Sequence, residues 1–205
     1  RARWALLYAF VAVGAAFTWN ELRTWSDDSG LELYVPYVGH GDGMVLSLPS
    51  GEIMLVDAGG AKFQSRFDPG EHVLAPLLRK IGTTRIDYVV ISHPDQDHIG
   101  GLHYLVERFS IGEVWLDERF FKHPRLEKDL EKVVLKGGRI RSFQSLPDTL
   151  LVGTTRFELI YPRAKHGLGK SDSTNQRSLV FRIVEGPSSV LLTGDLDAPM
   201  ERLIL

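Results

Sequence analysis

The residues best suited to chemistry lie in one short segment, His93-Pro94-Asp95-Gln96-Asp97-His98. Two imidazoles and two carboxylates this close together can reach one or two metal ions from a single rigid loop. The alternative is a surface turn in which one Asp caps the following helix and the histidines are incidental. Because capping needs a single Asp, we favour a metal site with His93, Asp95, Asp97 and His98 as ligands.

Two more carboxylates follow apolar runs that read as buried strands. Asp57 comes directly after such a run and before two glycines, which suits either a site-shaping role near a metal or a plain turn. Asp195 ends the segment LLTGD, where a carboxylate is suited to bridge two metals. We therefore take Asp195 as a further metal ligand. We take Asp57 as a catalytic-site candidate together with Asp97, which could orient an attacking water or accept its proton.

The elements that must position these residues alternate between strands and helices. Hydrophobic patterning predicts helices that begin after Asp68-Pro69, after Gly100-Gly101 and near Pro124. Strands are predicted over residues 31–38, 44–48, 52–56, 87–91, 113–116, 139–143, 156–161, 179–184 and 190–193. This order predicts an α/β layered fold, with the His93–His98 segment at the carboxyl end of the strand 87–91.

Composition narrows the class of protein. The 205 residues are 43% hydrophobic and 24% charged, which indicates one folded domain and excludes collagen, coiled-coil and low-complexity chains. A formal charge of -2 excludes a histone-like binder, so contact with nucleic acid requires a local basic patch. The absence of cysteine excludes a disulfide framework, a cysteine zinc site and a thiol nucleophile.

The N-terminal segment predicts a membrane helix. Residues 4–19 carry no charge, and Arg1 and Arg3 precede them while Glu21 follows. We assign 1–22 to a transmembrane helix, 23–30 to a linker and 31–205 to the catalytic domain. The positive-inside rule then places that domain outside the cytoplasm. A signal peptide and an ordinary buried helix are the alternatives. We read the chain as part of a longer polypeptide.

The metal-ligand segment resembles the His-x-His-x-Asp-His motif of the metallo-β-lactamase superfamily, with Asp95 at the second His position. The resemblance implies an αββα sandwich whose second half is incomplete at Leu205. It makes Asp57 the superfamily's first strand-end Asp and Asp195 the bridging carboxylate. It also assigns His93 and Asp95 to one metal site, and Asp97 and His98 to the other.

More specifically, the chain resembles the hydrolase domain of ComEC-type competence proteins, which are DNA-uptake channels. The resemblance rests on the SHPDxDH segment, on Val-Gly-x-Gly-Asp over residues 38–42, on NQRSLV over 175–180 and on LLTGD. It implies a membrane-tethered, metal-dependent phosphodiesterase that acts on DNA, with the rest of a channel polypeptide as a partner. The substrate-binding candidates are Asn175, Ser178, His40, Asp42 and Lys165. His40 replaces the family's usual Gln, and Asn175 stands where the superfamily's third motif has a His.

The ligand types favour particular metals. Asp95 in place of imidazole makes the site rich in oxygen, which favours Mn²⁺ first and Zn²⁺ or Mg²⁺ next. A metal pair would activate water for in-line displacement at phosphorus, without a protein nucleophile. Two alternatives remain open, namely a hydrolase of a small ester, lactone or β-lactam, and a non-catalytic module that guides DNA through a channel.

Two groups of basic residues are candidates for DNA contact. Arg125, Lys128, Lys132 and Lys136 share a predicted helix face, which we interpret as an ordinary solvated face. The loop residues Arg163, Lys165 and Lys170 are the preferred DNA-contact candidates.

Overall fold

The computed structural model describes residues 30–60, 67–163 and 173–204, and the fold is that of the unit Leu31–Leu205. The predicted membrane helix at 1–22 and nearly all of the predicted linker lie outside these ranges. Across the described ranges, no helix combines the length and the apolar character needed to cross a membrane.

Six strands form the first sheet. In spatial order they are β1 (Glu32–Tyr34), β2 (Met44–Ser47), β3 (Ile53–Val56), β4 (Arg85–Val90), β5 (Ser110–Leu116) and β6 (Arg139–Ser142). The strands β1, β2 and β3 pair antiparallel, whereas β3 to β6 pair parallel. All four residues of β3 are buried, as expected for a strand of a parallel sheet that is covered on both faces.

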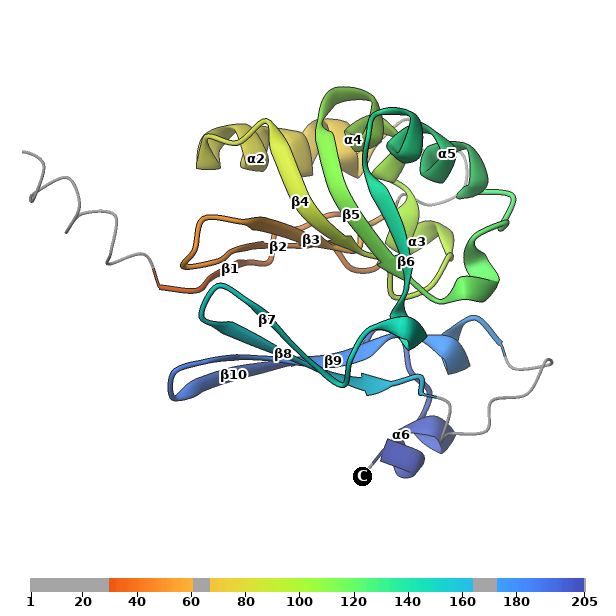
Figure 1. The fold of residues 1–205 in the computed structure, drawn as a ribbon. Coiled ribbons are helices and arrows are strands. Elements are labelled where there is room, and N and C mark those ends of the chain that lie inside the picture. Colours follow the sequence, from red (N-terminus) through yellow and green to blue (C-terminus); the bar gives the residue numbers. More distant parts are fainter. Residues whose placement is uncertain (1–29, 61–66, 164–172, 205) are drawn as a thin grey trace, which may run out of the picture. The chain divides into compact units, whose positions relative to one another are not determined.

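Helices connect the parallel strands and cover one face of this sheet (Figure 1). Along the chain they are the π-helical turn η1 (Gly70–Leu74) with α2 (Ala75–Ile81), then α3 (Gln96–Ile99) and α4 (Leu102–Arg108), then the 3-10 turn η2 (Glu118–Phe120) and α5 (Glu127–Leu135). The helix α2 ends at Gly82, whose φ of 89° is the left-handed conformation that favours glycine. In the helix predicted near Pro124, Leu126, Leu130 and Val133 lie at helical spacing and form a buried apolar stripe.

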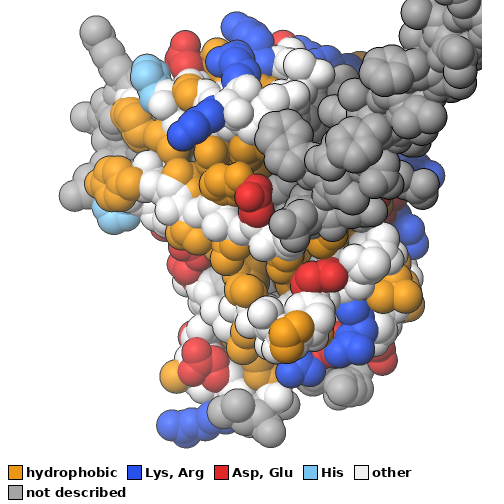
Figure 2. All heavy atoms as spheres, turned by 90° about the vertical axis from the view of Figure 1, so that its left-hand side faces the viewer, with side chains coloured by type: hydrophobic (Ala, Val, Ile, Leu, Met, Phe, Trp, Pro, Cys, Tyr) orange, Lys and Arg blue, Asp and Glu red, His pale blue; other side chains and the backbone are white. Residues whose placement is uncertain are grey.

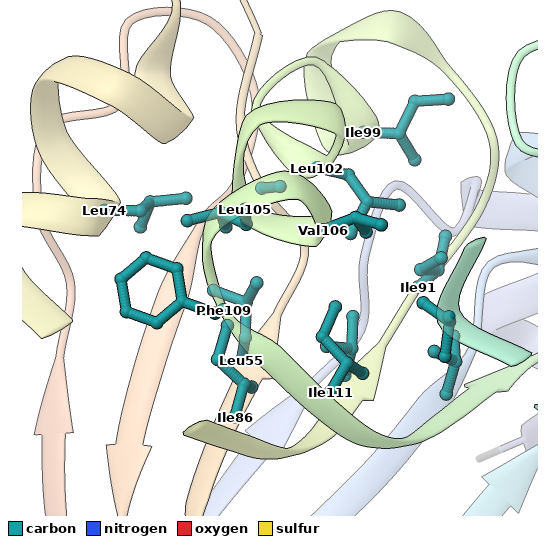
Figure 3. Close-up of a cluster of buried hydrophobic side chains, with 14 of the residues drawn as sticks. Leu55, Leu74, Ile86, Ile91, Ile99, Leu102, Leu105, Val106, Phe109 and Ile111 are labelled. Carbon is teal, nitrogen blue, oxygen red and sulfur yellow. The ribbon is translucent and has the colours of Figure 1, made fainter. Parts of the chain in front are cut away.

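A hydrophobic core fills the space between these helices and the sheet. In Figure 3, Leu102, Leu105 and Val106 of α4 lie over Leu55, Ile86 and Ile111 of the central strands. Leu105 and Leu74 are fully buried. Burial of apolar surface at this layer therefore holds the central strands and their carboxyl-end loops in fixed relative positions.

A second sheet of four antiparallel strands packs on the other face of the first (Figure 1). Its spatial order is β10 (Ser188–Leu192), β9 (Val180–Glu185), β8 (Thr155–Tyr161) and β7 (Thr149–Val152). Trp115 of the first sheet and Phe157 and Phe181 of the second form the centre of the core between the sheets. Beyond the second sheet, α6 (Ala198–Ile204) packs Met200 and Ile204 against Tyr161 and Val180.

Three helices or strands were not predicted, and several differ from their predicted bounds, among them β5, which covers Ser110–Leu116 instead of 113–116. The strand β7, the one-turn helix α3 and the helix α6 are absent from the sequence prediction, and the first strand covers three residues instead of the predicted 31–38. Pro36 within that run lacks the amide hydrogen that strand pairing needs, which accounts for the early end of β1.

The end of the sandwich shown in Figure 2 exposes hydrophobic side chains interspersed with charges of both signs.

Candidate metal centre

The candidate residues gather where three parallel strands end. Cα pairing aligns Val56 of β3 with Val90 of β4, and Val90 with Trp115 of β5. The residues that follow these strands, among them Asp57 and the segment from Ser92, therefore emerge at one edge of the sheet. In parallel α/β sheets this carboxyl edge is where ligands bind.

Asp57 is the hydrogen-bonding centre of the site, and its side chain is buried. Its Oδ1 accepts the Ser92 backbone N–H at 2.8 Å, and its Oδ2 accepts the Ser92 hydroxyl at 2.6 Å and His98 Nδ1 at 2.9 Å. Asp57 itself has a φ of 55°, an uncommon conformation for a residue other than glycine. These contacts suit a residue that orients Ser92 and His98 within the site.

The same hydrogen bonds fix which nitrogen of each imidazole is available. The Ser92 hydroxyl gives its proton to Asp57, so its oxygen accepts from His93 Nδ1 at 3.0 Å. His98 Nδ1 likewise donates to Asp57. In each neutral ring the free lone pair then belongs to Nε2, the arrangement seen for histidines that bind metals.

The two Nε2 atoms fit a metal ion. Both are buried and have no hydrogen-bond partner among the described residues. The two rings lie 4.0 Å apart between centroids, so both nitrogens reach the same small region. Because buried polar atoms in native proteins almost always have a partner, a pair of unpartnered ring nitrogens indicates a ligand that binds both.

Asp195 completes this group from the segment that follows β10 of the second sheet. Its Oδ1 lies 3.4 Å from His98 Nε2, and its Oδ2 lies 4.0 Å from His93 Nε2. Candidate ligand atoms of His93, His98 and Asp195 all fall within 4.8 Å of one another. Gly194 permits this approach, since its φ is 50° and a Cβ there would lie 2.9 Å from the Ser92 Cβ. The carboxylate therefore presents one oxygen to each imidazole.

Asp95 and Asp97 lie beside this group, outside its set of mutually close ligand atoms. Asp95 Oδ2 is 3.7 Å from His93 Nε2 and accepts a hydrogen bond from the Thr174 hydroxyl at 3.1 Å. Asp97 lies in the first turn of α3 and is half-buried, with its negative charge acting on His98. Neither carboxylate belongs to the ligand groups that the described residues form within 4.8 Å. The structure thus places both at the rim of the site.

The loop between β1 and β2 closes the other side. Asp42, Asp57 and His98 form a second group with ligand atoms within 4.8 Å of one another. Burial raises the pKa of the Asp42 carboxyl, and the nearby charge of His98 opposes that effect. Glycine is required at Gly41, where a Cβ would lie 1.9 Å from the carbonyl oxygen of Asp97. His40 is exposed and exchanges backbone hydrogen bonds of 3.0 Å with Gly60.

The two histidines titrate differently. Burial lowers the pKa of His93, and the positive charge of His98 lowers it further, so His93 is neutral at pH 7. Burial also acts to lower the pKa of His98, but the hydrogen bond and charge of Asp57, with the charge of Asp195, outweigh it and raise the pKa to about 9. In the absence of metal, His98 is an imidazolium held by Asp57. A metal ion would replace the proton on its Nε2.

The remaining residues predicted to contact substrate or DNA differ in how buried they are, and two of them lie outside the described residues. Ser178 is fully buried, and its hydroxyl lies 3.3 Å from His93 Nδ1, which corrects its assignment from substrate contact to support of the imidazole. Asn175 is half-buried at the start of the 3-10 turn η5 (Asn175–Arg177). Lys165 and Lys170 lie outside the described residues. The DNA-contact prediction for Arg163 is wrong, because that side chain is buried and donates to the carbonyls of Phe143 and Leu146.

Two of the basic residues predicted to share a helix face, Lys132 and Lys136, contact the neighbouring helix α4. Lys132 forms an ion pair with Glu107 of α4, and the Lys136 ammonium donates to the Val106 carbonyl at 2.5 Å. Both cations therefore hold α5 against α4.

Sequence reasoning missed four polar residues at the site, namely Ser92, Asp117, Thr174 and Arg177. Asp117 directly follows β5, in the same relation to its strand as Asp57 to β3, so the signal was available. It is fully buried and forms an ion pair with the buried guanidinium of Arg177. Thr174 carried no comparable signal, because its contact with Asp95 joins residues far apart in the chain.

Comparison with known proteins agrees with this geometry. The model of the metallo-beta-lactamase superfamily matches residues 37–204. ComE operon protein 3 of Bacillus subtilis (strain 168) is 30% identical over 179 residues, which are 82% of this chain and 22% of that protein. The uncharacterized protein YcaI of Escherichia coli (strain K12) is 29% identical over 174 residues, which are 85% of this chain and 20% of that protein. The chain thus spans about a fifth of the length of these relatives.

Among solved structures, the metallo-beta-lactamase fold protein YhfI from Bacillus subtilis superimposes with a TM-score of 0.51 at 18% sequence identity. The match covers 81% of this chain and 63% of that one. The likeness extends to the layered α/β architecture predicted from the sequence.

Proposed function

Because the chain belongs to the metallo-β-lactamase superfamily, we propose that it is a metal-dependent phosphodiesterase that acts on DNA during competence-type uptake. Its fold is that of the superfamily's hydrolases, and it is a distant relative of ComE operon protein 3. The substrate, the metal and the attachment to a membrane are parts of the proposal.

One observation carries the metal-dependent part. The Nε2 atoms of His93 and His98 are buried without a hydrogen-bond partner in the described parts of the chain, and Asp195 presents an oxygen to each of them. A capping turn with incidental histidines would leave these ring nitrogens exposed to water or bonded to protein. The three residues would hold the first metal ion, and Asp95 and Asp97 at the rim are the candidates for a second.

The chain's own residues have distinct tasks in such a site. Asp57 and Ser92 hold the Nδ1 protons of both imidazoles, so that Nε2 faces the site. Asp97, which is half-buried and precedes His98 in the chain, is our candidate to orient a water molecule or to accept its proton. When bound, divalent metal ions supply an activated water and stabilise the oxygens around the reacting phosphorus.

The ligand chemistry supports a phosphodiester substrate. Carboxylates outnumber imidazoles among the candidate ligands, which favours Mn²⁺, with Zn²⁺ or Mg²⁺ as the next choices. The identity to ComE operon protein 3 and the motifs shared with ComEC-type competence proteins support DNA as the substrate.

The uncharged run at residues 4–19 supports attachment to a cell membrane, with the domain on the extracytoplasmic side and the rest of a channel polypeptide as a partner. This run lies outside the described residues, so the sequence alone supports this part of the proposal.

The test is degradation of linear DNA by the chain with Mn²⁺, Mg²⁺, Zn²⁺ or a chelator. Asp195→Asn should abolish cleavage, because it removes a negative charge and one oxygen ligand from the group. Asp197→Asn is the matched control, since Asp197 caps α6 with its Oδ1 and Asn caps equally well.

Cleavage that requires metal, is lost in Asp195→Asn and is retained in Asp197→Asn would support the proposal. A chain that binds Mn²⁺ and hydrolyses a chromogenic ester or β-lactam but no DNA would refute the DNA substrate. A chain that binds DNA equally well with and without chelator, and cleaves none of these substrates, would instead be a guiding module.

A further inference from the structure

The turn η5 joins the second sheet to the candidate metal centre. At its start, the Thr174 hydroxyl donates to Asp95 Oδ2 at 3.1 Å. At its end, the Ser178 hydroxyl lies 3.3 Å from His93 Nδ1. The turn itself is closed by a backbone hydrogen bond of 3.0 Å from Arg177 N–H to the Thr174 carbonyl. One short segment therefore contacts two candidate ligands that belong to the first sheet.

A buried ion pair anchors this turn. The Arg177 guanidinium pairs with Asp117, and their side chains are 7% and 0% exposed. Asp117 is fixed in turn, because it directly follows β5 and its Oδ1 accepts the Arg119 backbone N–H at 2.9 Å. Arg177 Nε and Nη1 have no hydrogen-bond partner within the described residues, so Asp117 is the group that holds this guanidinium.

Two contacts fix the rest of the turn. The Tyr161 hydroxyl at the end of β8 donates to the Gln176 carbonyl at 2.6 Å. The Leu179 backbone N–H donates to the Ser92 carbonyl at 3.1 Å. The segment thus has one rigid position relative to both sheets, and the Thr174 hydroxyl has a defined place from which to reach Asp95.

Asp95 differs from Asp57 in how it is held. Three donors fix the Asp57 carboxylate, and that side chain is 1% exposed. The Asp95 side chain is 41% exposed, and Thr174 is the residue of the described chain that donates a hydrogen bond to its carboxylate. Without that donor, the carboxylate would have to be ordered by the metal ion itself.

We propose that Thr174 is a positioning residue that orients the Asp95 carboxylate toward the metal, and that the Arg177–Asp117 ion pair holds Thr174 in place. The inference rests on the proposed metal site but not on DNA as the substrate. Loss of hydrogen-bond partners behind metal ligands elsewhere costs about 10- to 100-fold in metal affinity. We expect a loss at the lower end of this range for Thr174→Val, because Asp95 itself stays in place.

The experiment measures Mn²⁺ affinity by calorimetric titration of the whole chain, with melting of the metal-free chain and the electron paramagnetic resonance spectrum of bound Mn²⁺ as further readouts. Thr174→Val should bind Mn²⁺ about 10-fold more weakly than the unmodified chain and give an altered spectrum, with an unchanged metal-free melting temperature. The matched control is Thr155→Val, which removes a hydroxyl-to-carboxylate hydrogen bond of 2.6 Å with Glu185 at the far end of β8 and β9.

The ion pair is tested in the same titration. Arg177→Met should weaken Mn²⁺ binding at least as much as Thr174→Val, and Arg177→Lys should restore part of the affinity. Arg182→Met is the control, because Arg182 pairs with Glu158 on an exposed face of the second sheet. If Arg177→Met does not fold, Thr174→Val decides the question alone.

Three results would overturn the inference. The first is a Thr174→Val affinity within twofold of the unmodified chain. The second is an equal loss in Thr174→Val and Thr155→Val, which would indicate general destabilisation. The third is an unmodified chain that binds no divalent metal, which would refute the proposed function as well. Normal metal binding without DNA cleavage would refute only the substrate and leave the inference to be decided by the titration.

Discussion

Metal binding by this chain should release a proton that comes from His98. The pKa of His98 is about 9 in the metal-free chain, because Asp57 and Asp195 outweigh the effect of burial. At pH 7.5 His98 therefore carries about one proton that the metal must displace from Nε2, whereas an imidazole with an ordinary pKa of about 6.5 would carry about a tenth of one. His93 adds nothing, since its pKa is lowered.

The release of this one proton sets how strongly the Mn²⁺ affinity depends on pH. Apparent Mn²⁺ affinity should rise about tenfold per pH unit between about pH 7 and pH 9, and level off above that. Titration calorimetry in two buffers of different ionisation enthalpy counts the protons directly, and should give about one per metal ion at pH 7.5 and close to none from His98 at pH 10.

A variant separates His98 from other sources of protons. A metal-bound water can also release a proton, and does so in every variant. Asp57→Asn removes the negative charge that raises the pKa of His98, so the proton release of this variant at pH 7.5 should fall by about one. Asp148→Asn is the control, because that carboxylate is 89% exposed and pairs with Arg163 instead. Equal proton release in the unmodified chain and in Asp57→Asn would refute the reasoning.

Three further outcomes are expected. Since the folded pKa of His98 is raised to about 9, its stabilising contribution is fully present below about pH 6.5 and is lost as the pH rises through about 9. The melting temperature of the metal-free chain should therefore fall across this window, and a flat profile would contradict it. Gly41→Ala should weaken Mn²⁺ binding in titration, because its Cβ would meet a backbone carbonyl of α3 at 1.9 Å, whereas Gly51→Ala, with open space around its Cβ, should leave the affinity unchanged. In denaturant unfolding, Leu105→Ala should cost about 2–5 kcal/mol, and Leu135→Ala, at an 86% exposed site, less than about 0.5 kcal/mol.

Local sequence patterns predicted most of the first sheet and its helices. The strand before Asp57, the strand before His93 and the apolar stripe of α5 all lie in the predicted positions. In these elements the buried face is formed by residues close in sequence, so its period identifies the element. The pattern failed for β7, because Leu151 is 64% exposed although it is apolar like its partly buried neighbour Leu150, so the sequence does not alternate between apolar and polar residues.

The sequence determined which residues supply the chemistry, because a run of four ligand-type side chains within six residues has few other uses. It could not determine how each is used. The tertiary structure brings Asp195, which follows β10 of the second sheet, against His93 and His98 of the first, and places Asp95 and Asp97 at the rim.

Only the tertiary structure showed which residues support the candidate metal ligands. Ser178, which the sequence suggested as a substrate contact, lies beside Nδ1 of His93, and Arg177 and Asp117 form a buried ion pair. The physical reason is that ligand type is a property of a single side chain and its neighbours in the sequence. Distance, burial and hydrogen-bond partnership depend on how the two sheets pack, and that packing brings together residues as far apart in the chain as His93 and Asp195.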